Sequence, residues 1–209
     1  PVDAKYREQA IEFQSRSESL ADITRRLASI PLLCQPGSQW NYSVATDVLG
    51  RLVEVLSGMS LADFLQQRIF APLKMVDTGF SVPEQTQHRF ASLYAPKVGG
   101  DMSSVGGAAS RVPQDERGGL VLQEGSAQSV YFEAPGSHSG GGGLVGTIGD
   151  YARFCQMLIN EGELDGERIL APSTLRYMRT NQLPDNSDMA GMGQPVWSET
   201  SYDGIGFGL

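Results

Sequence analysis

The sequence predicts an α+β domain in which helices dominate. Four or five segments carry apolar residues at helical spacing between start and stop signals, whereas only a few short runs alternate as strands do. These elements do not follow the regular alternation of a parallel βαβ chain, and the strands are too few for an all-β sandwich. The chain has 209 residues, 40% of them hydrophobic, which suffices for one ordinary domain or for a large piece of a bigger one.

The first half of the chain contains three of the predicted helices. Ser-Leu-Ala-Asp occurs at 19–22 and again at 60–63, and each copy resembles a capping box before a run with helical periodicity. Each of these two runs ends at a proline. Between them, residues 44–56 predict a helix, and Gly58 follows where a C-cap glycine belongs. The apolar residues that share one face of this helix are Val48, Leu49, Leu52, Val53 and Leu56.

The strand signals are short and follow residue 76. Runs at 77–82, 89–94 and 128–133 have the composition or alternation of strands, and the end of the chain, 204–209, reads as a glycine-rich strand. Residues 99–149 hold 14 of the 25 glycines, which predicts a region rich in loops.

Two more helices are predicted in the second half. Residues 147–150 form a third capping box, and the helix that they open ends at Gly162. The last helix starts at Pro172, a residue suited to the first helical position, and runs through Leu175 and Met178. No internal repeat is visible in the sequence.

Charge and hydropathy exclude several classes of partner. The net charge is −8 and the pI is about 4.7, so the surface repels nucleic acid and anionic lipid. No apolar run approaches the ~20 residues that span a bilayer. The first residues resemble no signal peptide. Pro1 is not an initiator methionine, so two interpretations stay open, the start of a fragment and a natural start. The compartment, cytoplasm or periplasm, stays open.

The residues that bind metals are scarce. Cys34 and Cys155 have no Cys-x-x-Cys spacing, and we expect them to be buried thiols. With only two histidines, His88 and His138, a multi-histidine metal site is not expected. The sequence therefore predicts neither a metal nor a cofactor.

Three motifs suggest chemistry that their surroundings do not support. Residues 141–146 fit G-x-G-x-x-G, but a polar turn and not a buried strand leads into them, so a closely packed glycine loop is the better interpretation. Residues 77–79 spell Asp-Thr-Gly, but an aspartic protease needs a second such aspartate, so we expect a turn here. Residues 136–140 resemble a nucleophile elbow, but histidine stands where the serine belongs.

Two stretches carry a family resemblance. The first contains Pro36-Gly37, Trp40-Asn41-Tyr42-Ser43, Asp47-Val48-Leu49-Gly50-Arg51-Leu52 and Asp77-Thr78-Gly79-Phe80. The second contains Gly140 to Leu144, Thr147, Asp150-Tyr151-Ala152-Arg153-Phe154, Leu164-Asp165-Gly166 and Leu170-Ala171-Pro172. In order and spacing they resemble the serine β-lactamase-like superfamily, which includes class C β-lactamases, DD-peptidases and related esterases. The resemblance covers about two-thirds of the chain and implies the β-lactamase/transpeptidase-like fold, mostly its helical region with part of the antiparallel sheet.

The resemblance also implies a site. Members of this family surround the substrate with Ser-x-x-Lys, Tyr-x-Asn and Lys-Thr-Gly or His-x-Gly. Tyr42 matches the catalytic tyrosine, and Ser43 and Val44 would bind the substrate. The alternative for Tyr42 is an aromatic ring packed under the start of a helix. Val44 stands where lactam-cleaving relatives have asparagine, which resembles the esterase branch, so a small ester is the expected substrate and a β-lactam a further one.

The pattern is incomplete in these 209 residues. None of the three lysines follows a serine at Ser-x-x-Lys spacing, and Lys-Thr-Gly is absent. We therefore interpret residues 1–209 as the central segment of a serine hydrolase domain, inactive alone, with the nucleophile and the last strands outside it. A complementing chain segment is then the expected partner. The alternative is a non-catalytic relative of the penicillin-binding proteins that binds a ligand or a partner chain.

Overall fold

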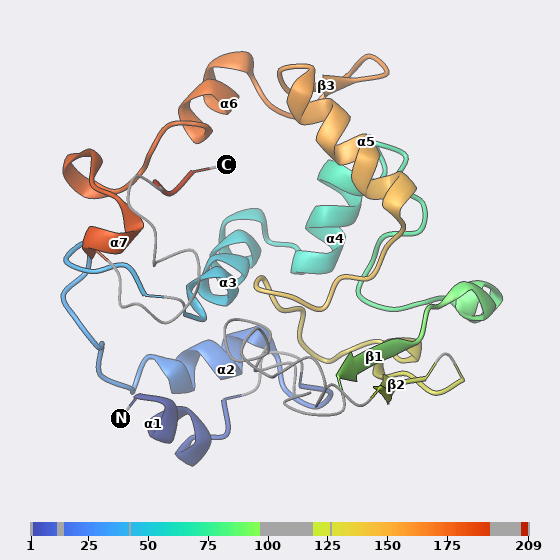
Figure 1. Cartoon of the computed structure of the whole chain (residues 1–209), viewed down its shortest axis with the longest axis horizontal. Coiled ribbons are helices and arrows are strands. Elements are labelled where there is room, and N and C mark those ends of the chain that lie inside the picture. Colours follow the sequence, from blue (N-terminus) through green and yellow to red (C-terminus); the bar gives the residue numbers. More distant parts are fainter. Residues whose placement is uncertain are drawn as a thin grey trace. The chain divides into compact units, whose positions relative to one another are not determined.

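The computed structural model describes six stretches of the chain (Figure 1). The chain divides into two compact units. Each unit is built from segments that lie far apart in the sequence. The first unit comprises residues 1–34, 42–82 and 133–179, and the second comprises 35–41, 83–132 and 180–209. The described residues are 2–11, 15–41, 43–96, 119–125, 127–192 and 206–208.

Helices make up most of the regular secondary structure described in the first unit. Its elements are α1 (Val2–Glu8), α2 (Leu20–Leu27), α3 (Ala45–Ser57), α4 (Leu61–Leu65), the π-helical turn η1 (Gln66–Phe70), α5 (Ile148–Ile159), β3 (Glu163–Leu164), β4 (Glu167–Arg168) and α6 (Pro172–Met178). The two short strands pair antiparallel as a hairpin directly after α5. This content matches the α+β class that the sequence predicts, with helices in the majority.

The three predicted capping boxes are confirmed at the starts of α2, α4 and α5. In each box the N-cap hydroxyl accepts a hydrogen bond from the backbone N–H of an aspartate three residues later, at 3.1–3.2 Å. These bonds satisfy N–H groups that a helix leaves without a partner in its own first turn. The pairs are Ser19 with Asp22, Ser60 with Asp63, and Thr147 with Asp150.

The core of the first unit lies between η1, the turn after it and α5. Phe70, Leu73 and Met75 meet Met157 of α5, and none of these four side chains is more than 6% exposed. Full burial of one such side chain stabilises a fold by roughly 1.5–3 kcal/mol, so this cluster fixes α4 and η1 against α5. The partly buried residues packed against it are Leu65, Ile69, Phe154, Leu158, Leu164 and Ile169.

Helix α3 has the predicted position but an unexpected orientation. It ends at Gly58, whose φ of +70° is the left-handed value that glycine adopts freely, as predicted. The buried residues of α3 are Asp47 and Gly50, whereas five apolar side chains are between 43% and 78% exposed. Among the described residues, then, the apolar face of α3 lacks a cover. The exposed side chains are Val48, Leu49, Leu52, Val55 and Leu56.

The prediction of a strand at 77–82 is wrong. Asp77 lies in a turn, and the only ladder contact in this run of described residues is an isolated antiparallel bridge between Gly79 and Val145. The buried carboxylate of Asp150 accepts hydrogen bonds from the Asp77 N–H and the Thr78 hydroxyl, both at 2.8 Å. Because this carboxylate binds the backbone N–H of Asp77, the start of the run forms the turn that Asp-Thr-Gly was expected to form.

The second unit contains a small sheet and several short helical turns. Its elements are η2 (Glu84–Arg89), β1 (Leu93–Pro96), β2 (Leu120–Glu124), η5 (Val130–Phe132), η6 (Pro184–Asn186) and α7 (Met189–Met192). Strands β1 and β2 pair antiparallel, with a register shift between Leu93 and Tyr94. The strand predicted at 89–94 therefore begins late, at Leu93; Arg89 is the last residue of η2, and residues 90–92 belong to neither element. Residues 206–208 have no strand partner in the part described, and the rest of the predicted strand at 204–209 lies outside it.

The strand predicted at 128–133 is also wrong, since Val130–Phe132 form the 3₁₀ turn η5. The Glu124 carboxylate accepts hydrogen bonds from the Ser129 hydroxyl and from the Val130 N–H. Ser129 Oγ in turn accepts the Tyr131 N–H at 3.1 Å. Such side-chain bonds to nearby backbone N–H groups favour a turn over an extended ladder.

Candidate active site

The structure describes two of the three predicted site residues. Tyr42 lies outside the described residues. Ser43 and Val44 follow it and lead directly into α3. The exposed Ser43 Oγ accepts a hydrogen bond from the Ala45 N–H at 3.1 Å, and half-buried Val44 is the N-cap residue of α3. The turn expected to bind substrate is thus continuous with a 13-residue helix.

Asp47, in the first turn of α3, joins this helix to a distant loop. Its carboxylate is 5% exposed, and its Oδ1 accepts the Ser139 hydroxyl at 2.5 Å and the Gly141 N–H at 3.3 Å. The Ser139 hydroxyl oxygen also accepts the Gly141 N–H, at 3.1 Å. A buried charge is stable only where such hydrogen bonds replace its hydration, so this contact fixes the loop to α3.

The glycine run after Ser139 lets the two segments approach closely. A Cβ on Gly140 would lie 2.2 Å from the Thr46 carbonyl oxygen, and one on Gly50 would lie 2.9 Å from Leu61 Cδ2 and 3.4 Å from the Gly140 Cα. Real Cβ atoms do not approach backbone this closely, so only glycine fits at position 140. The close packing agrees with the interpretation of residues 141–146 as a packed glycine loop.

The segment before the glycine run is also held inside the first unit. The Ser15 carbonyl oxygen accepts the N–H groups of Gly136 and Ser137 at 2.9 and 3.0 Å, and Ser137 is 2% exposed. The His138 ring packs against Phe80, with ring centroids 4.8 Å apart. Residues 136–139 are therefore anchored by backbone contacts, which agrees with the turn expected here instead of a nucleophile elbow.

His138 is the one titratable group in this loop whose pKa departs clearly from its ordinary value. Burial lowers the pKa of the imidazole, and the negative charges of Glu54 and Asp63 oppose this shift only in part. Burial therefore favours the neutral form of the ring, which is in contact with the ring of Phe80.

Sequence reasoning missed Asp47. One signal for it was available in the sequence: the N-cap residue of α3 is Val44, which has no side-chain oxygen with which to cap the helix. An aspartate three residues after such a position is free to bind elsewhere. The identity of its partners, Ser139 and Gly141, could not be read from the sequence, because more than ninety residues separate them from Asp47.

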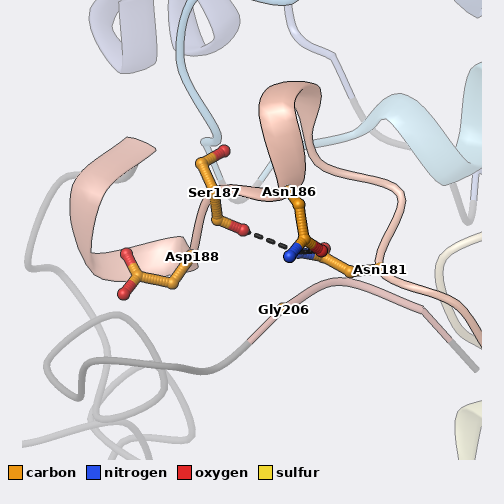
Figure 2. A pocket seen from close by; sticks show the side chains of 5 residues that line it. All are labelled: Asn181, Asn186, Ser187, Asp188 and Gly206. Carbon is orange, nitrogen blue, oxygen red and sulfur yellow. Dashed lines mark hydrogen bonds between the residues drawn. The ribbon is translucent and has the colours of Figure 1, made fainter.

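The second unit contains a polar hollow of about 550 Å³ (Figure 2). The Asn181 side chain joins its walls: Nδ2 donates to Asn186 Oδ1 at 3.2 Å and to the Ser187 carbonyl at 2.7 Å. Its Oδ1 accepts the N–H groups of Leu183 and Phe207, at 3.1 and 2.9 Å. The amide is thus fully used in holding the loop to residues 206–207. The lining residues are Asn181, Asn186, Ser187, Asp188 and Gly206.

The described residues offer no metal site and no membrane helix. No group of three or more histidine, cysteine, aspartate or glutamate side chains gathers there as a metal would require. Within the same residues, no helix combines the length and the apolar character that a bilayer span demands. Cys34 and Cys155 are free thiols, as expected, but both are half-buried where buried thiols were expected.

Comparison with known proteins extends over nearly the whole chain. The family model described as beta-lactamase matches residues 3–208. The esterase EstB of Burkholderia gladioli is 35% identical over 194 residues, which are 92% of this chain and 44% of that protein. An uncharacterised protein of Mycobacterium tuberculosis is 34% identical over 184 residues, which are 88% of this chain and 40% of that protein. The chain therefore spans less than half the length of these two relatives.

Solved structures show the same fold. EstCE1, described as a hydrolase with promiscuous acyltransferase activity, superposes with a TM-score of 0.62 at 27% identity, over 87% of this chain and 45% of that one. A penicillin-binding protein homologue from Caulobacter crescentus superposes with a TM-score of 0.56 at 21% identity, over 84% and 49% of the two chains. These matches confirm the predicted β-lactamase/transpeptidase-like fold.

Proposed function

Because this chain belongs to the β-lactamase family, we propose that the complete protein is a serine hydrolase that cleaves small esters. The observation that carries this proposal is the 35% identity with the esterase EstB over 92% of the chain. The similarity to the hydrolase EstCE1 supports the same reaction class, transfer of an acyl group to water or to another acceptor.

In the proposed reaction a serine oxygen attacks the ester carbonyl carbon, and the bond from that carbon to the leaving alcohol breaks. Tyr42 takes the serine proton and passes it to the departing alcohol. Water then attacks the acyl-serine, releases the acid and restores the serine hydroxyl. A phenol with an ordinary pKa of about 10 can act as this base only where nearby cations stabilise the phenolate.

Val44 supports an ester over a lactam as the substrate. Its side chain offers no hydrogen bond, so it cannot hold the amide of a lactam side chain as an asparagine would. The loss of one hydrogen-bonding partner disfavours a substrate that needs it by about 1–3 kcal/mol. We expect ester cleavage to dominate, with any β-lactam cleavage slower.

We place the nucleophile in a part of the complete protein outside these 209 residues. The chain contains no Ser-x-x-Lys, and the two relatives EstB and the Mycobacterium tuberculosis protein are more than twice as long as their matched parts. The exposed apolar face of α3 supports this placement, because 43–78% exposure of five neighbouring apolar side chains is unfavourable unless another segment covers them. The cover that we propose is the remainder of the same domain.

The proposal is tested with the complete gene product and with residues 1–209 alone, assayed side by side on p-nitrophenyl acetate and on nitrocefin. We expect the complete protein to hydrolyse the ester faster than the lactam and to show a burst of p-nitrophenol as the serine is acylated. The 209-residue chain is expected to release product no faster than buffer.

Two results would contradict the proposal. Ester hydrolysis by the 209-residue chain at the rate of the complete protein would place the nucleophile inside this sequence. A folded complete protein that cleaves neither substrate would instead favour the non-catalytic relative that binds a ligand or a partner chain.

A further inference from the structure

Asp47 and the turn at Ser43 and Val44 are held together at the start of α3. Asp47 lies three residues after Val44, and its N–H donates to the Val44 carbonyl at 3.1 Å. Any shift of the first turn of α3 therefore moves Val44 and Asp47 together. Ser43 is tied to the same turn through the Ala45 N–H.

The Asp47 carboxylate fixes the position of the glycine segment that follows Ser139. It binds Ser139 and Gly141, and it is one of only five polar residues that are buried in the described part of the chain. Residues 140–142 are exposed glycines, so the surface beside the first turn of α3 carries backbone atoms without side chains. This exposed backbone borders the turn that is expected to bind substrate.

A second aspartate in the first unit offers an internal comparison. Asp150 occupies the same position in α5 that Asp47 occupies in α3, three residues after the N-cap, and is 6% exposed. It also accepts one backbone N–H and one hydroxyl, from Asp77 and Thr78. The two aspartates thus make equivalent contacts, but only Asp47 lies on the helix that carries the predicted site.

From this difference we infer that Asp47 is a positioning residue for the proposed ester hydrolysis. It fixes the glycine run at Ser139–Gly141 against the turn that follows Tyr42 and so shapes the wall beside the acyl group. This inference rests on the proposed function. Asp150, by contrast, contributes to folding alone.

The test uses the complete protein with paired substitutions at the two aspartates. Asp47→Ala and Asp150→Ala each remove a carboxylate, whereas Asp47→Asn and Asp150→Asn each keep an oxygen that accepts the same two hydrogen bonds. Ser139→Ala and Thr78→Val form a milder pair that removes one donor each, and they keep the test usable should an alanine variant fail to fold. The measurements are kcat and KM for p-nitrophenyl butyrate, together with the urea midpoint of unfolding.

We expect Asp47→Ala to lower kcat/KM by about tenfold to a hundredfold, since a small misplacement of substrate-positioning groups has effects of that size. Asp47→Asn should recover most of the loss, and Ser139→Ala should reduce kcat/KM in the same direction. The Asp150 and Thr78 variants should lower the urea midpoint of unfolding about as much as the matching Asp47 and Ser139 variants do. Their kcat and KM, measured on the folded protein, should stay unchanged.

The inference is overturned if the Asp47 and Asp150 pairs affect kcat and KM alike, because Asp47 would then be structural only. It is also overturned if Asp47→Asn is as impaired as Asp47→Ala, because the hydrogen bonds would not be the cause. A folded wild-type protein without esterase activity would refute the proposed function itself, which is a different result from an active protein that is indifferent to Asp47.

Discussion

Gly140 has no room for a side chain, because a methyl group there would lie 2.2 Å from the Thr46 carbonyl oxygen. We expect Gly140→Ala to lower the free energy of unfolding by about 1–3 kcal/mol, the usual result of forcing an extra methyl into a closed contact. Gly149→Ala is the matched control, since its Cβ would meet only Thr147 Oγ1 at 3.7 Å inside α5. This change should stabilise the protein by up to about 1 kcal/mol, the helix preference of alanine over glycine.

Urea unfolding of the 209-residue chain and its two variants checks this pair. The expected signs are opposite for the same chemical change. Equal stability of the Gly140→Ala variant and the parent would show that the glycine run is not held against α3 as described.

His138 makes stability depend on pH in a direction that can be derived. Burial lowers the pKa of the folded imidazole, so protonation favours the unfolded chain, in which a histidine has a pKa of about 6.5. The contribution of His138 is fully present above the unfolded pKa and is lost as the pH falls through it towards the lower folded pKa. We therefore expect His138→Gln to remove part of the stability loss seen between pH 7.5 and pH 5.5.

The check is the free energy of unfolding of the parent and of His138→Gln at both pH values. The parent should lose more stability than the variant over this interval. An equal loss in both proteins would mean that the imidazole is not desolvated beside Phe80.

At the scale of single elements, the N-cap of α4 is a sharp test because the helix is short. The Ser60 hydroxyl accepts the Asp63 N–H at the start of a five-residue helix that leads into the core residue Phe70. Ser60→Ala should lower the free energy of unfolding by about 1 kcal/mol. Ser173→Ala, at an exposed position in the first turn of α6, is the control and should stay within about 0.5 kcal/mol of the parent. Equal effects from the two changes would contradict the capping role of Ser60.

Elements fixed by neighbouring residues were predictable, and elements fixed by distant ones were not. Ser60 and Asp63 lie within one turn, so their spacing alone predicts the helix start that the structure confirms. The run at 77–82 has the composition of a strand, but Asp150 binds its first residues from more than seventy positions away. No local pattern contains that contact, and this is why the strand prediction failed.

The candidate site shows the same limit. The helix that follows residues 42–44 could be predicted, because a helical period is a property of contiguous sequence, whereas the roles of Tyr42, Ser43 and Val44 stay predictions from the family resemblance. The contact of Asp47 with Ser139 and Gly141 could not be predicted, since it joins segments more than ninety residues apart. The orientation of α3, with Asp47 and Gly50 buried, depends on that contact and was missed with it.

At the scale of the whole molecule, the exposed face of α3 predicts that the same double substitution has different effects on the 209-residue chain and on the complete protein. Leu52 and Leu56 are 47% and 78% exposed in the described chain. The double change Leu52→Gln with Leu56→Gln should leave the stability of residues 1–209 nearly unchanged and should reduce binding of a hydrophobic dye. In the complete protein, where we propose that this face is covered, the same change should cost several kcal/mol.

The comparison needs urea unfolding and dye binding on both lengths of protein. Equal small effects in both would show that the remainder of the domain does not cover α3. Equal large effects would show that the face is already packed within the 209 residues.

The role of Tyr42 in acylating a serine is the central claim, and the most direct measurement is the burst of p-nitrophenol when the complete protein meets p-nitrophenyl acetate. Tyr42→Phe removes the phenol oxygen and little else. We predict that the burst rate falls by about a hundredfold or more, as the loss of a general base requires, while the urea midpoint of unfolding stays that of the wild type. An undiminished burst from a folded Tyr42→Phe protein would contradict the account.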